Sequence, residues 1–280
     1  MAEIHPSSIV DAQAELAEDV VVGPGCVIEG RVRIGAGTRL IGNIYLRGPL
    51  TIGQNNTLYP FVCIGFEPQD RKCIPGSFAT AGVVIGHRNL LREGVTIHCA
   101  SQDQRPTTVG DDNMLMTNSH VGHDARVGNR CVLTSGGLVG GHAQLHDQAY
   151  LGGGSAIHQF CRMGRMSFIG GVSAITKDLP PFTIASGGIN SVTGLNLVGL
   201  RRSGFKSKTI DQVRAAFDTL YLSAHTNPVA AALLAQQAAE LADTDPEAAG
   251  LVREIAQFVQ TSERGLVPHA MLNAKHGMQR

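Results

Sequence analysis

Residues 109–180 read VGDDNM LMTNSH VGHDAR VGNRCV LTSGGL VGGHAQ LHDQAY LGGGSA IHQFCR MGRMSF IGGVSA ITKDLP when they are divided into units of six. Each unit begins with an aliphatic residue or methionine, which we call the marker. In most units the residue two places before the next marker is small, as in Ala125 and Ala143. Side chains two places apart on an extended strand point to the same side. Both residues are therefore predicted to face a common interior.

The same six-residue spacing extends toward the N-terminus. Aliphatic markers recur at positions 4, 10, 16, 22, 28, 34, 40, 46, 52, 58 and 64, and again at 85, 91 and 97. Glycine often follows the marker, and we expect it to supply the backbone angles of a tight corner. These glycines are Gly23, Gly35, Gly53, Gly86, Gly110, Gly128, Gly152 and Gly164. Three hexads would close a triangular turn, and stacked turns would pair as parallel strands. The sequence predicts a mainly β fold, a parallel β-helix of hexapeptide repeats.

Composition limits the function classes. Lys and Arg together number 23, as do Asp and Glu, so the formal net charge gives no indication of nucleic-acid binding. No long apolar run and no signal peptide is found, so we expect no transmembrane segment. The six cysteines include no CxxC pair, which argues against a zinc ribbon or a disulfide framework. A cytoplasmic protein with reduced thiols is the expectation.

The repeat is interrupted twice and then stops. A polar insertion separates Ile64 from Ile85, and Asp103 stands where a marker is expected between Ile97 and Val109. We therefore predict loops at about 66–82 and 99–108, and such loops on a rigid scaffold commonly carry binding residues. Residues 182–200 look irregular, and a helical period begins near 207. The predicted division is a β-helix over residues 1–188, followed by an irregular linker and a C-terminal α-helical domain over 189–280.

Histidines converge on one edge of the predicted column. Residues 18 apart should stack, so the hexads that begin at 121, 139 and 157 share a face. Subtraction of the two insertions places the hexads of Ile97 and Ile64 below them. The resulting cluster contains His98, His120, His123, His142 and His158, with the loop that carries Asp70 leaving from the same face. His87 and His146 do not join it and are interpreted as surface residues.

This cluster suggests general-base chemistry. A histidine near its ordinary pKa of about 6.5 can accept a proton at neutral pH, and a carboxylate on one ring nitrogen makes the other more basic. Asp124 follows His123 directly, so the two can pair only at a corner. The glycines before His142 expose backbone N–H groups suited to an oxyanion. With no Ser or Cys nucleophile evident beside the cluster, direct acyl transfer is favoured over a covalent intermediate.

Several motifs together make the chain resemble the UDP-N-acetylglucosamine O-acyltransferase family of hexapeptide-repeat acyltransferases. They are HVGHD at 120–124, GNRC at 128–131, GH at 141–142, AIHQF at 156–160, DLPP at 178–181 and GLRRSGF at 199–205. The resemblance covers nearly the whole chain. It implies a left-handed β-helix, a homotrimer with sites between subunits, and no cofactor or metal. The implied reaction transfers a 3-hydroxyacyl chain from acyl carrier protein to the 3-hydroxyl of UDP-N-acetylglucosamine, the first step of lipid A biosynthesis.

The resemblance also implies roles for single residues. His123 would be the base, Asp124 would orient it, and the Gly141 N–H would stabilise the oxyanion. Asn196 and Arg202 would bind the uridine diphosphate, and Gly171 would lie where acyl length is measured. The remaining substrate-binding residues would be Asp70, Lys72, His98, His120, His142, His158 and Gln159. Six basic residues either meet the acidic carrier protein or merely solvate a face: Arg162, Arg165, Arg201, Arg202, Lys206 and Lys208.

Alternatives remain open at this point. The acceptor is either N-acetylglucosamine or a 3-amino analogue, because Cys99 stands where the family usually has Arg. A UDP-3-O-acylglucosamine N-acyltransferase is a rival, although that enzyme normally has an extra N-terminal domain and hexads here begin at Ile4. A zinc hydratase of the γ-carbonic-anhydrase type is another, with His120, His123 and His142 as ligands. A structural or carrier-binding protein without activity is the last.

Overall fold

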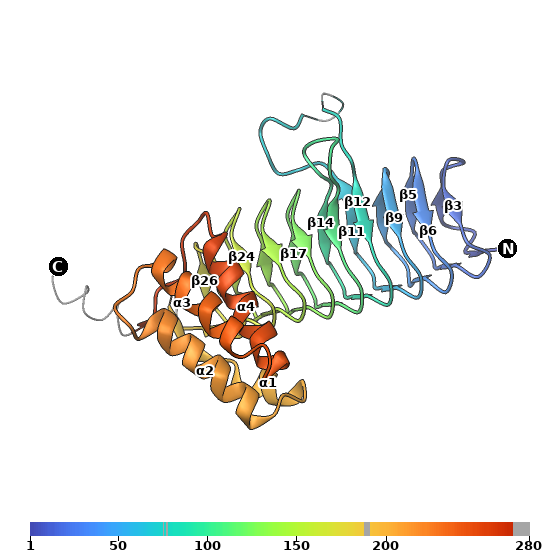
Figure 1. The fold of residues 1–280 in the computed structure, drawn as a ribbon. Helices are drawn as coiled ribbons and strands as arrows, with labels where there is room; N and C mark the ends of the chain where they lie inside the picture. Colours follow the sequence, from blue (N-terminus) through green and yellow to red (C-terminus); the bar gives the residue numbers. More distant parts are fainter. Residues whose placement is uncertain (75, 77, 188–190, 271–280) are drawn as a thin grey trace.

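The computed structural model describes residues 1–74, 76, 78–187 and 191–270. It is a long column of parallel β-strands, with helices packed against the last turns (Figure 1). Successive strands pass in order to three different sheets, and every third strand returns to the same sheet one turn further along. This arrangement confirms the parallel β-helix predicted from the hexads, in the left-handed form that the family resemblance implied.

In the part of the chain that the structure describes, the strands form three sheets. The first contains β1 (Glu3–Ile4), β4 (Val21–Val22), β7 (Arg39–Leu40), β10 (Thr57–Leu58), β13 (Leu90–Leu91), β16 (Met114–Leu115), β19 (Val132–Leu133), β22 (Tyr150–Leu151), β25 (Phe168–Ile169), β27 (Thr183–Ala185) and β28 (Val192–Leu195). The second contains β2 (Ile9–Val10), β5 (Val27–Glu29), β8 (Tyr45–Arg47), β11 (Cys63–Phe66), β14 (Thr96–His98), β17 (His120–Val121), β20 (Leu138–Val139), β23 (Ala156–Ile157) and β26 (Ala174–Ile175). The third contains β3 (Glu15–Leu16), β6 (Val32–Ile34), β9 (Leu50–Ile52), β12 (Val83–Ile85), β15 (Thr107–Val109), β18 (Arg126–Val127), β21 (Gln144–Leu145) and β24 (Arg162–Met163).

The register across the two insertions agrees with the sequence count. Val121 pairs with Ile97, and Ile97 in turn pairs with Ile64. Val139 pairs with both Val121 and Ile157 on the following turns. The histidine-bearing hexads therefore do stack on one sheet, the second, as predicted.

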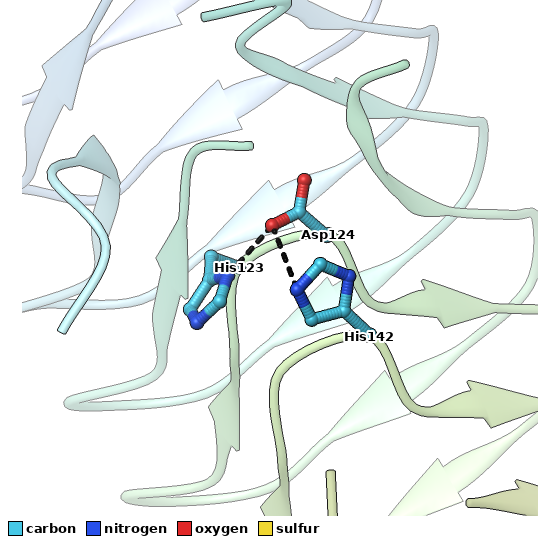
Figure 2. A group of neighbouring side chains, drawn as sticks. All are labelled: His123, Asp124 and His142. Atoms are coloured by element: carbon cyan, nitrogen blue, oxygen red, sulfur yellow. Dashed lines mark hydrogen bonds and ion pairs between the residues drawn. The ribbon is translucent and has the colours of Figure 1, made fainter. Parts of the chain in front are cut away.

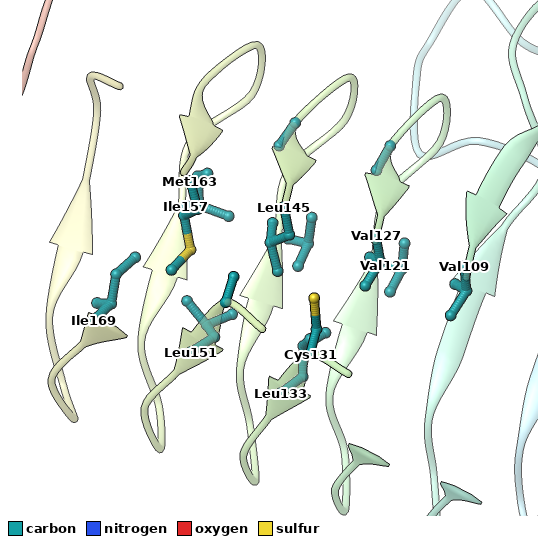
Figure 3. Close-up of a cluster of buried hydrophobic side chains, with 14 of the residues drawn as sticks. Val109, Val121, Val127, Cys131, Leu133, Leu145, Leu151, Ile157, Met163 and Ile169 are labelled. Atoms are coloured by element: carbon teal, nitrogen blue, oxygen red, sulfur yellow. The ribbon is translucent and has the colours of Figure 1, made fainter. Parts of the chain in front are cut away.

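The interior of the column is filled with stacked small and aliphatic side chains. Leu133, Leu151 and Ile169 stack in the first sheet and are fully buried (Figure 3). The small residues before the markers, such as Cys131 and Ser155, are also fully buried. Burial raises the pKa of the Cys131 thiol to about 12, which agrees with the packing role expected for it. At the open N-terminal end the marker residues are less buried, and Ile4 is 43 % exposed.

The corners differ from expectation in one respect. None of the eight glycines named above has left-handed backbone angles. Glycine is required there by close stacking, since a Cβ on Gly23 would lie 2.1 Å from the Ile41 carbonyl oxygen of the next turn. The left-handed position lies two residues later and often holds a larger residue, including Asp124, His142 and Phe160, with φ of 60°, 60° and 65°.

Both insertions leave the column at the corner between the second and third sheets. The first runs from Glu67 to Gly82 and forms the most prominent protrusion in Figure 1, and the second spans Cys99 to Pro106. The strands thus resume at Thr107, slightly before the predicted loop end. The two loops bind each other, because the Ala81 N–H donates to the Gln102 carbonyl at 2.8 Å.

The segment after residue 181 is more regular than predicted. β27 and β28 form an antiparallel pair at the end of the first sheet, and α1 (Leu197–Arg202) follows. Then come α2 (Ser207–Tyr221), α3 (Asn227–Glu240) and α4 (Pro246–Gln260). The hairpin was missed because its strands do not keep the hexad spacing, and they pair locally instead.

Charged contacts join α4 to the last turns of the column. Arg162 forms an ion pair at 3.0 Å with Asp178, whose side chain is fully buried, and its guanidinium also lies over the ring of Phe258. Arg165 makes a bidentate pair with Glu254. Two of the six basic residues considered for carrier binding are therefore engaged within the chain.

Among the described residues, no helix combines the length and the apolar character needed to cross a membrane.

Candidate active site

His123 and Asp124 form a dyad at the corner between β17 and β18. The His123 Nδ1 lies 2.6 Å from Asp124 Oδ2, and both side chains are largely buried (Figure 2). Adjacent side chains on a strand would diverge, but the left-handed angle at Asp124 turns its carboxylate back toward the imidazole. An ionised carboxylate only accepts hydrogen bonds. The Nδ1 must therefore carry the proton, which leaves Nε2 free to accept one.

The second loop holds the carboxylate in place. The Ser101 N–H donates to Asp124 Oδ1 at 3.1 Å and Oδ2 at 3.2 Å. The Thr107 hydroxyl oxygen accepts the Asp124 N–H at 2.8 Å. Burial raises the pKa of Asp124, but the hydrogen bonds from His123 and Ser101 outweigh it, so the pKa lies below its ordinary value. The aspartate is therefore ionised at neutral pH.

Gly141 faces the free nitrogen of His123 from the next turn. A Cβ on Gly141 would lie 2.7 Å from Nε2 and 2.9 Å from Cε1. The missing side chain keeps this nitrogen accessible. Among the described residues none accepts a hydrogen bond from the Gly141 N–H, which agrees with the donor role predicted for it. The backbone N–H of His123, at the same corner position one turn earlier, also has no backbone acceptor. Gly141 is therefore distinguished by its position beside His123 Nε2.

His142 lies on the other side of the same carboxylate. Its Nε2 is 3.6 Å from Asp124 Oδ2, and its ring meets that of His123 edge-on with centroids 5.1 Å apart. Phe160 stacks on it, with centroids 4.5 Å apart and planes inclined by 8°. Burial lowers the pKa of His142, although the charge of Asp124 opposes this shift.

One group of side chains among the described residues could hold a metal ion. It consists of His123, Asp124 and His142, whose ligand atoms all lie within 4.8 Å of one another. The hydratase alternative required His120 as the third ligand. That histidine is not a member of this group, and its Nδ1 contacts the Thr96 hydroxyl at 2.7 Å.

His120 lies on β17, just before the dyad, and His98 lies on β14, one turn below it. Their rings meet edge-on with centroids 4.9 Å apart. Burial, with smaller contributions from the neighbouring histidines, lowers the pKa of His98 to about 4. Burial also lowers the pKa of His120. Both are therefore neutral at pH 7, and the buried His98 Nδ1 has no hydrogen-bond partner within the part of the chain that the structure describes.

The other predicted residues near the dyad are more exposed. His158 and Gln159 lie at the same corner one turn above Gly140 and are exposed. The first loop carries Asp70 toward the site, and the charge of this carboxylate raises the pKa of His142 against the effect of burial. Lys72 is exposed on the same loop, and its backbone N–H donates to the Asp70 carboxylate at 3.0 Å. The register argument thus placed these residues at one edge.

Asn196 and Arg202 do not join this cluster within one chain. They line a separate cavity of about 570 Å³ between α1 and the outer face of the first sheet, beside the stacked rings of Tyr150 and Phe168. The Asn196 side chain caps α1, because its Oδ1 accepts the Gly199 N–H at 2.9 Å and its Nδ2 donates to the Met166 carbonyl at 2.8 Å. Gly171 lies at the opposite edge of the second sheet and is exposed.

The interpretation of His87 and His146 as surface residues was wrong for His146 only. The His87 Nδ1 accepts the Gln54 N–H at 2.9 Å and so caps a corner. His146 is half-buried beneath α4, edge-on to Phe258. The supporting residues Thr96, Ser101 and Thr107 were missed altogether. A hydroxyl on the neighbouring turn was a weak signal for two of them, but the Ser101 contact is a backbone one that no side-chain pattern indicates.

Fold and site together define an enzyme of the hexapeptide-repeat class with a histidine–carboxylate dyad on one corner. Residues 178–267 match the family model described as UDP-N-acetylglucosamine O-acyltransferase, domain 2. The acyl-[acyl-carrier-protein]–UDP-N-acetylglucosamine O-acyltransferase of Thermodesulfovibrio yellowstonii is 46 % identical over 222 residues, which covers 79 % of this chain and 85 % of that protein. The chain belongs to the UDP-N-acetylglucosamine O-acyltransferase family.

Solved structures agree with this assignment. The UDP-N-acetylglucosamine acyltransferase of Francisella novicida has a TM-score of 0.87 at 29 % identity and covers 97 % of this chain and 96 % of its own. The LpxA protein of Acinetobacter baumannii has a TM-score of 0.85 at 36 % identity, with 94 % and 99 % covered. Membership of this family removes the N-acyltransferase, the hydratase and the non-enzymatic alternatives.

Proposed function

We propose that this chain transfers a 3-hydroxyacyl group from acyl carrier protein to the 3-hydroxyl of UDP-N-acetylglucosamine, the first step of lipid A biosynthesis. The relative from Thermodesulfovibrio yellowstonii carries both substrates in its name. The observation that supports the chemistry most directly is the 2.6 Å contact between His123 Nδ1 and Asp124, with Nε2 left open toward Gly141.

The reaction needs one proton acceptor. His123 Nε2 takes the proton of the sugar hydroxyl while that oxygen bonds to the thioester carbonyl carbon, and the carbonyl electron pair moves to its oxygen. The Asp124 carboxylate stabilises the imidazolium that forms. When the tetrahedral intermediate collapses, the C–S bond breaks and the imidazolium returns its proton to the thiolate. A positioned general base of this kind contributes about 10² to 10⁴ in rate.

The Gly141 N–H is the proposed donor to the oxyanion. It lies at the corner directly above the dyad, and no acceptor in the described part of the chain competes for it. A backbone donor requires no reorganisation during the reaction, which is the physical basis of such stabilisation. The base, His123, and the oxyanion donor, Gly141, therefore lie on two successive turns of one rigid column.

Neutral imidazoles fit the recognition of an uncharged sugar. His98 and His120 are uncharged at pH 7, as their lowered pKa values require, so each offers a donor and an acceptor nitrogen. We assign them, with His142, His158 and Gln159, to contacts with the sugar nucleotide or the thioester arm. Asp70 and Lys72 would hold the sugar from the first loop.

We propose a homotrimer with sites between subunits, which the position of Asn196 and Arg202 supports. These residues line a cavity on the first sheet, whereas the dyad lies at the corner of the second and third sheets. We propose that they bind the uridine diphosphate of a substrate whose sugar lies at the dyad of the adjacent subunit. The exposed Arg201, Lys206 and Lys208 remain available to an acidic carrier protein.

Gly171 is proposed to set the acyl length. A Cβ there would meet its nearest neighbour, the Gly153 carbonyl oxygen, at 3.4 Å, so the surface is open above it. Gly171→Met would fill this space. We expect the preferred donor to become shorter by several carbons in an assay with acyl carrier proteins of varied chain length. An unchanged preference would contradict the assignment.

The test of the proposed function is an acyl-transfer assay with UDP-N-acetylglucosamine and 3-hydroxyacyl carrier protein. His123→Ala should lower kcat by about 10² to 10⁴. His225→Ala, an exposed histidine after α2, is the matched control and should keep full activity. Parallel reactions with the 3-amino analogue identify the acceptor. Full activity of the His123 variant would refute the proposed base.

A further inference from the structure

Behind the dyad, on its third-sheet side, lies a polar cavity that the proposed chemistry does not use. It has a volume of about 390 Å³ and is lined by Gln102, Gln104, Arg105, Pro106, Asp124, Arg126 and His142. One wall is the second loop and the other is the outer face of β18. The cavity therefore touches the same Asp124 and His142 side chains that the reaction requires.

Two exposed arginines, Arg105 and Arg126, line this cavity. None of the ion pairs within the described part of the chain includes either of them. Most other arginines on the outer faces of the column are paired, as Arg33 is with Glu15 and Arg88 with Asp112. Two unpaired guanidiniums on one cavity create a local positive potential that attracts anions.

The single carboxylate in the cavity does not cancel this charge. Asp124 already accepts hydrogen bonds from the Ser101 N–H and from His123, and His142 lies 3.6 Å away. An anion would therefore meet two positive side chains and two neutral amides, those of Gln102 and Gln104. Planar guanidinium groups suit the oxygens of a phosphate, and amide NH₂ groups can complete its hydrogen bonding.

The loop that carries Arg105 is anchored at both of its ends. The Ala100 and Thr107 N–H groups both donate to the Gly82 carbonyl at 3.1 Å, and Ala81 binds Gln102. Arg126 stands on β18, next to the corner that holds the dyad. The cavity is thus built from the scaffold and the anchored loop that also position the catalytic carboxylate.

We propose that this cavity binds a phosphate group of a substrate, with Arg105 and Arg126 as its ligands. The proposal rests on the proposed function, in which both substrates carry phosphate. The diphosphate of the UDP-sugar is already assigned to Asn196 and Arg202, so the phosphate that fits this cavity is the phosphodiester of the phosphopantetheine arm of the carrier. The phosphate is held beside Asp124 and helps to position the reacting group at His123.

Steady-state kinetics can test this assignment. Arg105→Gln and Arg126→Gln should each raise the KM for the acyl carrier about tenfold with kcat largely retained, the effect expected when one charge-assisted hydrogen bond is lost. Acyl pantetheine without phosphate should be used equally by wild type and variants. A rise in the KM for UDP-N-acetylglucosamine alone would overturn the proposal.

Arg39→Gln provides a matched control. Arg39 is an exposed arginine on β7 in the first sheet, remote from this cavity, and its loss changes the net charge equally. Arg126→Lys keeps the charge but not the two-pronged geometry, and it should restore affinity only in part. A double glutamine variant with both KM values within twofold of the Arg39 variant would overturn the proposal.

A binding measurement separates this proposal from the proposed function. Calorimetric titration with pyrophosphate requires no turnover. Wild type should bind pyrophosphate, and the double glutamine variant should lose at least tenfold in affinity. If wild type binds pyrophosphate through these arginines but transfers no acyl group, the site stands and the proposed function fails. If both proteins bind pyrophosphate with equal affinity and wild type transfers the acyl group normally, the proposed function stands and the phosphate site is refuted.

Discussion

Gly141→Ala tests whether the rate of acyl transfer depends on the exact position of the His123 imidazole ring. The new Cβ would lie 2.7 Å from Nε2, whereas ordinary contacts begin near 3.4 Å, so the ring must retreat by about 0.7 Å (3.4 − 2.7). His142 stands edge-on to this ring and Asp124 binds it at 2.6 Å, so such a retreat disturbs the dyad. Displacement of a catalytic group by about 1 Å can lower the rate about 10²-fold. The corresponding loss is about 2.7 kcal/mol of transition-state stabilisation.

The measurement is kcat/KM in the acyl-transfer assay, together with the melting temperature. Gly141 lies outside the left-handed region, so alanine is compatible with its backbone and the fold should persist. Gly250→Ala in α4 is the matched control, because nothing lies within 4 Å of its Cβ position. It should keep full activity and gain about 0.5 to 1 kcal/mol in stability. A folded Gly141→Ala enzyme within twofold of wild type would refute the reasoning.

Three further predictions concern pH, the helical domain and metal. The pKa of His98 is about 4 in the folded protein and about 6.5 in the unfolded chain, so its contribution to stability is present above pH 6.5 and is lost as the pH falls toward 4. In His98→Gln the urea midpoint should therefore depend less on pH between 6.5 and 4. An unchanged pH dependence would exclude His98 as its cause. Asp178→Ala removes the fully buried carboxylate and leaves the half-buried Arg162 without its ion-pair partner, which should cost about 3 to 5 kcal/mol in chemical denaturation. Glu15→Ala in an exposed pair should cost about 1 kcal/mol or less, and equal losses would contradict this reasoning. Dialysis against a chelator should leave acyl transfer unchanged, and loss restored by zinc would contradict the proposed mechanism.

The sequence by itself determined the column and its register. Hexad markers are a one-dimensional signal, because each turn contacts only its neighbours. Counting residues was therefore enough to stack Ile64, Ile97 and Val121 correctly across two insertions. The same count placed His98, His142 and His158 near the dyad, since in a solenoid the distance along the chain translates directly into height.

Only the tertiary structure decided how the site is supported. The Ser101 N–H that holds Asp124 belongs to a loop whose path depends on the other loop, and no periodicity encodes such a path. The corner glycines showed the same limit, because their role depends on the distance to the next turn and not on their own backbone angles. The burial of His146 under α4 likewise depends on how two separate domains pack. Repetition fixes neighbours within the column, whereas contacts between loops and domains arise from packing that six-residue spacing does not describe.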